Sequence, residues 1–184
     1  MMISILNIDE GTATLLAAII AAIFSFFTLL SIKPKEIRAA NRKTLEPYIY
    51  DLSDSIHQLI AISNIIIKTK TDESLKNWRE KAETAKKKLK DIRPKIRYSL
   101  WGLEDYILSL TKLPDFTQYT LSDIEVAKKV VKKGTQLGDC LDNCIRKCYS
   151  SGRTPKFYEL WRLKYYNWRF TKIRNEYKMK RNSN

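Results

Sequence analysis

The chain has 184 residues and a formal net charge of +14, with 34 lysines and arginines against 20 aspartates and glutamates. A surplus of this size indicates a polyanionic partner, such as lipid headgroups, nucleic acid or a nucleotide. Five glycines and five prolines leave little room for a turn-rich β architecture, so the composition favours an all-helical fold.

The apolar segment 12–32 contains no charged residue. As a helix that rises about 1.5 Å per residue, it reaches about 31 Å, roughly the hydrocarbon thickness of a bilayer. A secretory signal peptide needs a basic region before its apolar core, whereas the short leader 1–11 carries only Asp9 and Glu10. We therefore predict an uncleaved transmembrane helix over 12–32, with the leader on the extracytoplasmic side.

A basic cluster follows the apolar segment, in the juxtamembrane stretch 33–47. Its members are Lys33, Lys35, Arg38, Arg42 and Lys43. The positive-inside rule then predicts a single-pass protein of the inner membrane, with its amino terminus outside and the rest in the cytoplasm. The same cations are expected to attract anionic lipid headgroups. Because residues 1–32 hold only two charges, both negative, the remainder of the chain carries +16.

The cytoplasmic domain, 48–184, is predicted to be all-α with about five to six helices, because apolar residues recur at spacings of three and four. The expected helices cover about 35–46, 48–68, 71–92, 96–110, 122–149 and 154–177, with an irregular connection over 112–120. The first either continues the membrane helix through Pro34 or restarts after it. The sequence Ser-Asp-Ile-Glu at 122–125 predicts a capping box, with Ser122 and Glu125 satisfying the first amide donors.

Side chains that could carry catalysis are scarce. His57 is the only histidine, and Asp139 and Asp142 have no basic or histidine partner at a recognisable spacing. The chain has three cysteines, one helical turn apart: Cys140, Cys144 and Cys148. They could offer three thiolates to a metal, but no fourth ligand is near and the spacing matches no common zinc motif, so we interpret them as core residues. We predict no catalytic residue, no metal, no cofactor and no enzymatic activity.

The final helix is unusual because two opposite faces of it are apolar. One arc holds Phe157, Trp161, Tyr165 and Trp168. The other arc holds Leu163, Tyr166, Phe170, Ile173 and Tyr177. Two apolar faces need two partners, so one face packs on the domain itself. The other packs on a neighbouring subunit, or its rings stack on bases while nearby cations meet phosphates.

A second basic patch lies at 128–133, where two pairs of lysines one turn apart share a broad face. These lysines either form an ordinary solvated surface or act as a set of point charges that bind phosphate. The predicted nucleotide-binding residues are Lys128, Lys129, Lys132, Lys133, Arg162, Tyr165, Trp168 and Arg169.

This layout of one membrane helix before a small, basic, helical domain resembles the cyclic-oligoadenylate-binding membrane effectors of type III CRISPR anti-phage systems. The resemblance covers the whole chain and rests on no short motif. It implies a homo-oligomer, with a tetramer suspected, whose domains bind a cyclic oligonucleotide and whose membrane helices then disrupt the inner membrane. The alternatives are a membrane-anchored interaction or superinfection-exclusion protein without a small-molecule ligand, and a membrane-tethered nucleic-acid binder.

Overall fold

The computed structural model describes residues 10–69 and 72–182, which form seven α-helices, one 3-10 helix and no strand. The all-α character predicted for the chain is confirmed. The helices are α1 (Glu10–Leu45), α2 (Ile49–Lys68), α3 (Asp72–Ile92), η1 (Arg93–Ile96), α4 (Glu104–Thr111), α5 (Leu113–Tyr119), α6 (Ile124–Ser151) and α7 (Phe157–Asn182).

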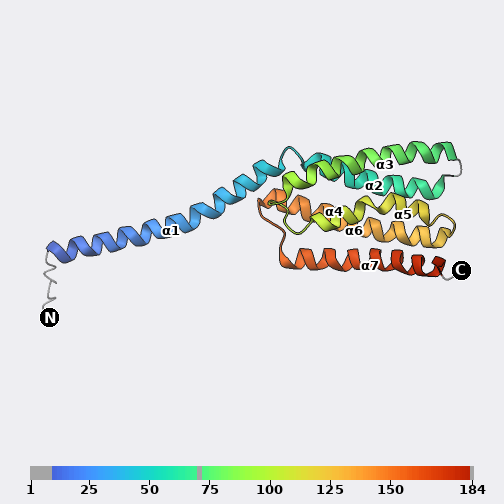
Figure 1. Cartoon of the computed structure of the whole chain (residues 1–184). Coiled ribbons are helices and arrows are strands. Elements are labelled where there is room, and N and C mark those ends of the chain that lie inside the picture. The colour runs from blue at the N-terminus through green and yellow to red at the C-terminus, as the bar shows by residue number, and fades with distance from the viewer. Residues whose placement is uncertain (1–9, 70–71, 183–184) are drawn as a thin grey trace.

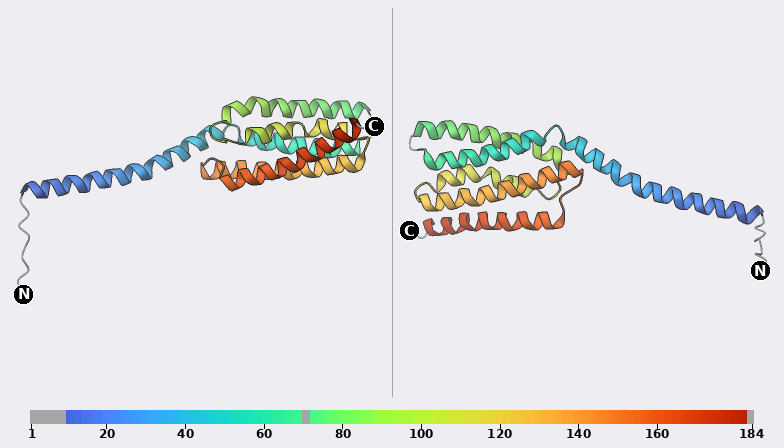
Figure 2. Two further views of the ribbon diagram at one scale, coloured as in Figure 1. Left: turned by 60° about the horizontal axis from the view of Figure 1, so that its bottom comes forward. Right: turned by 180° about the vertical axis from the view of Figure 1, so that it is seen from behind.

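Helices α2 to α7 form an elongated bundle, and α1 projects away from one end of it (Figure 1). The short helices α4 and α5 follow one another along the bundle, beside α2 and α6. Helix α6 contacts α1, α2, α4, α5 and α7 and is therefore the central element. Two further views show α7 beside α6 on the outer side of the bundle (Figure 2).

The predicted transmembrane helix is corrected by the structure. Within the described residues, no helix combines the length and the apolar character that crossing a membrane requires. α1 runs from Glu10 to Leu45 and carries both the segment 12–32 and the basic cluster that follows it. The prediction of a single-pass inner-membrane protein, and with it the orientation inferred for the span, is therefore wrong.

The first helix also answers the question raised by Pro34. α1 continues through Pro34 and ends at Leu45, so the apolar segment and the basic cluster belong to one helix. The side chains of the basic cluster are exposed along its last three turns. The topology role of this cluster was inferred from a span that the described residues do not contain, and its attraction to anionic lipid headgroups stays a prediction. Most of the predicted leader, residues 1–9, lies outside the described residues.

Two local predictions are also corrected. The connection expected over 112–120 contains helix α5, which opens on Pro114 in its first turn and buries Leu113 and Phe116. The start of α6 is capped by Asp123, whose Oδ1 accepts a hydrogen bond from the Val126 amide at 3.1 Å. Ser122 does not cap this helix, because its hydroxyl is hydrogen-bonded to the Tyr177 hydroxyl at 2.8 Å.

Helix α6 ends at Gly152, in a left-handed conformation with φ of 65°. A side chain here would place its Cβ 2.3 Å from the carbonyl oxygen of Arg38 in α1. The Asn41 side-chain amide donates to the Gly152 carbonyl at 3.3 Å. Glycine at 152 therefore ends α6 and permits the base of α1 to pack directly against that end.

Gly152→Ala is expected to destabilise the protein by at least about 1–2 kcal/mol, the cost of a left-handed non-glycine residue, and more because of the clash with α1. Urea unfolding followed by circular dichroism measures this difference. The matched control is Ser151→Ala, which changes the neighbouring residue without requiring positive φ and is expected to stay within about 0.5 kcal/mol of wild type. Equal stability of both variants would contradict the close approach of α1 to Gly152.

Candidate functional site

The two apolar faces predicted for the last helix are both present in α7. Its inner face packs on the bundle through fully buried Leu163 and Phe170, with Tyr166, Ile173 and Tyr177 beside them. The outer face carries the aromatic row, which consists of Trp161, Tyr165 and Trp168, exposed by 70%, 50% and 56%. Within the described part of the chain, the aromatic row faces outward from the bundle.

Cations accompany the aromatic row at contact distance. The guanidinium carbon of Arg169 lies 5.6 Å from the centre of the Tyr165 ring, and Arg169 also donates to the Tyr165 hydroxyl at 3.0 Å. The ammonium of Lys172 lies 5.4 Å from the Trp168 ring centre. These are cation–π distances, so each cation lies over one face of its ring and leaves the other face for further contacts.

A shallow hollow of about 440 Å³ lies along the aromatic row. Its lining consists of Trp161, Arg162, Lys164, Tyr165 and Trp168. The structure therefore brings together three of the predicted site residues, Arg162, Tyr165 and Trp168, and adds Arg169 through its contact with Tyr165. Trp161 and Lys164 extend the predicted set; Trp161 was visible in the same apolar arc as Tyr165.

The lysine patch at 128–133 is not part of this hollow. Lys128 is paired with Glu125 at 3.1 Å, and Lys133 donates to Gln136 at 2.9 Å, both within α6. Lys129 and Lys132 are exposed. The side chains of Lys128 and Glu125 are 59% and 74% exposed, and ion pairs this exposed contribute little to the stability of the fold. The contacts of this patch match a solvated face of α6.

A groove of about 400 Å³ separates α6 from the first turns of α7. Its lining consists of Gln136, Asp139, Cys140, Asn143, Cys144, Lys147, Tyr158, Glu159, Arg162 and Tyr166. Arg162 lines both this groove and the hollow along the aromatic row. Its guanidinium carbon lies 5.9 Å from the Tyr166 ring centre. Arg162 therefore connects the two concave surfaces of α7.

A buried ion pair holds the connection between α6 and α7. Arg153 donates to both carboxylate oxygens of Glu159, each at 2.7 Å, and the Lys156 amide donates to one of them at 2.8 Å. The Glu159 side chain is only 8% exposed. The hydrogen bonds from Arg153 lower the pKa of Glu159 below its ordinary value despite burial, so the carboxylate is ionised. The bidentate geometry makes this a strong, directional contact.

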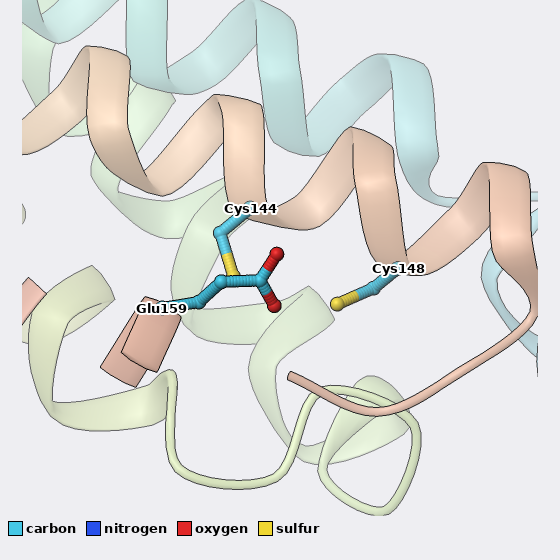
Figure 3. Close-up of side chains that lie close together, drawn as sticks. All are labelled: Cys144, Cys148 and Glu159. Atoms are coloured by element: carbon cyan, nitrogen blue, oxygen red, sulfur yellow. The ribbon is translucent and has the colours of Figure 1, made fainter. Parts of the chain in front are cut away.

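Beside this ion pair lie two of the three cysteines. The sulfur atoms of Cys144 and Cys148 and a carboxylate oxygen of Glu159 lie within 4.8 Å of one another, and all three residues are buried (Figure 3). The hydrogen bond to Cys148, together with burial, raises the pKa of the Cys144 thiol. Cys140 lies one turn earlier, half-buried in the groove wall. Glu159 was not recognised as a neighbour of the cysteines because it belongs to the next helix.

A second polar network joins α2 to α6 and corrects the sequence analysis of the aspartates. One carboxylate oxygen of Asp142 contacts His57 at 3.3 Å and Arg146 at 2.7 Å. Arg146 also donates to the Ser53 hydroxyl at 2.6 Å. Asp142 therefore has both a basic and a histidine partner. The arginine, four residues later on the same helix, could have been recognised from spacing, whereas His57 is brought in by packing.

Arg153→Ala is expected to lower the free energy of unfolding by about 3 kcal/mol or more, because Glu159 would remain buried without its counter-ion. Denaturant unfolding measures the loss. Lys128→Ala removes an exposed pair instead and is expected to cost less than about 1 kcal/mol. Similar effects of both substitutions would show that the Arg153–Glu159 pair contributes no more than a surface contact.

Comparison of the chain with protein-family models, with curated proteins and with solved structures gives no match.

Proposed function

We propose that this protein binds an oligonucleotide, linear or cyclic, on the outer face of α7. The bases stack on the aromatic row, and the phosphates pair with Arg162, Lys164, Arg169 and Lys172. The single observation that supports this most strongly is the exposed row of three large rings with cations held beside them at cation–π distance.

The chemistry of the face favours this ligand class over an uncharged one. α7 carries eight lysines and arginines but only two glutamates, and one of these, Glu159, is already neutralised by Arg153. The other, Glu176, lies near Lys172 at 3.8 Å. The net field of this helix is therefore strongly positive, which suits a ligand with several phosphates. Exposed aromatic side chains are expensive to leave in water, so a partner with π faces completes the surface.

The effector role implied by the type III CRISPR resemblance is not part of this proposal, because its membrane-disrupting step depends on a span that no helix of the described residues provides. The same applies to the membrane-anchored alternatives. What remains of the original hypothesis is recognition of a nucleotide polyanion by the helical bundle. Self-association through the outer face of α7 is the competing explanation, and the binding experiment separates the two.

Replacing Trp161 and Trp168 by alanine is expected to weaken binding of a short single-stranded oligonucleotide by about tenfold per ring, since each base–ring stack contributes about 1–3 kcal/mol. Fluorescence anisotropy with a labelled single strand and competition by cyclic tetra-adenylate measure the affinity. Stronger competition by the ring than by a linear tetranucleotide identifies a cyclic ligand.

The matched control is Trp101→Ala, which removes an equally exposed ring, 68% exposed, from the connection between η1 and α4. Binding by this variant is expected to equal that of wild type. Undiminished binding by Trp161→Ala and Trp168→Ala, or equal competition by inorganic polyphosphate, would contradict base stacking. Loss of a dimer in light scattering by these two variants, without oligonucleotide binding by wild type, would establish self-association instead.

A salt titration distinguishes binding at the outer face of α7 from binding at the lysine patch of α6. Arg169→Gln is expected to reduce the slope of log affinity against log salt by about 0.7, the value for one phosphate contact on a single strand. Lys132→Gln, in the lysine patch, is expected to leave the slope unchanged because that patch lies outside the α7 hollow. A larger effect of Lys132→Gln than of Arg169→Gln would move the binding surface to α6.

A further inference from the structure

The junction between α6 and α7 gathers three donor atoms of metal-ligating type. Cys144 and Cys148 come from successive turns of α6, and Glu159 comes from the first turn of α7. Their sulfur and carboxylate oxygen atoms all lie within 4.8 Å of one another, with every one of the three residues buried. Figure 3 shows both sulfur atoms directed toward the Glu159 carboxylate. Small inward movements of these side chains would bring all three to one ion.

The Glu159 carboxylate retains capacity for such an ion. An ionised carboxylate offers about four lone-pair positions. Arg153 uses two of them and the Lys156 amide uses a third, on the oxygen Oε2. One position therefore remains, on Oε1. Ligating carboxylates in proteins are ordinarily oriented by hydrogen bonds of this kind, so Arg153 and the Lys156 amide would act as the supporting shell of the site.

Charge and donor type indicate the kind of metal. Two thiolates and one carboxylate bring three negative charges. A bound divalent ion reduces the net charge of the site to −1, and the positive charge of Arg153 balances it. Sulfur donors select thiophilic ions such as Zn²⁺ over Mg²⁺ or Ca²⁺, which prefer oxygen. Access is available because Cys144 and Glu159 line the groove between α6 and α7, where a water molecule can supply a fourth donor.

We propose that Cys144, Cys148 and Glu159 form a binding site for Zn²⁺ or a similar thiophilic divalent ion. Cys140 is not a ligand of this site, although it lies on the same face of α6, because its sulfur is outside the cluster. The ion joins the last turns of α6 to the first turn of α7 across the connecting residues 152–156. The proposal does not depend on oligonucleotide binding by α7.

The test uses the full chain, reduced and freed of metal, titrated with Co²⁺ as a spectroscopic substitute for Zn²⁺. Wild type is expected to develop thiolate-to-metal charge-transfer absorption and the visible bands of tetrahedral Co²⁺, and Zn²⁺ should abolish both by displacing the cobalt. Cys144→Ser and Cys148→Ser are expected to bind at least about tenfold more weakly, because even the loss of a supporting residue costs 10–100-fold.

The matched control is Cys140→Ser, which removes the third cysteine of the same helix face and should bind Co²⁺ as wild type does. Because a core substitution could also unfold the chain, circular dichroism accompanies each titration, and Cys144→Ala and Cys148→Ala repeat the measurement with an apolar replacement. Absence of charge-transfer absorption in wild type overturns the proposal. So does its persistence in folded variants of Cys144 and Cys148, or its loss in Cys140→Ser.

Discussion

Burial of one apolar face of α6 is the interaction on which the rest of the structure depends. Val130, Leu137, Leu141 and Ile145 are essentially inaccessible along this helix, which contacts five other helices. Each fully buried side chain of this size contributes about 1.5–3 kcal/mol. Because α6 is 28 residues long, this face spans the bundle from the end of α5 to the base of α1. The remaining helices are arranged around it.

Packing on α6 also determines what α7 can do. Its inner face is fixed by Leu163 and Phe170, and the roughly 100° advance per residue then directs Trp161, Tyr165 and Trp168 away from the bundle. The rigid inner contact holds the outer rings in a fixed spacing along the helix, which lowers the ordering cost of binding an extended ligand. Structural stability and the proposed binding surface therefore come from opposite faces of one helix.

The junction of α6 and α7 combines features that a purely apolar core lacks. A carboxylate that is 8% exposed is tolerated because Arg153 and a backbone amide satisfy it, and two thiols lie in the same small volume. The groove beside them shares Arg162 with the hollow along the aromatic row. The buried cluster of two thiols and a carboxylate, the groove between α6 and α7, and the hollow along the aromatic row therefore meet at the first two turns of α7.

The sequence alone was sufficient for the helical class and for the two faces of α7, since both follow from periodicity, a local property of the chain. The membrane span predicted at 12–32 was wrong, since no helix among the described residues qualifies as one. The connection predicted at 112–120 was wrong because a helix of seven residues is too short to show a period. Only the tertiary structure decided that Glu159 lies beside Cys144 and Cys148, that His57 reaches Asp142, and that the lysine patch lies outside the α7 hollow. These neighbours come from different helices or different turns, and their proximity is set by how the helices pack around α6, which no local spacing encodes.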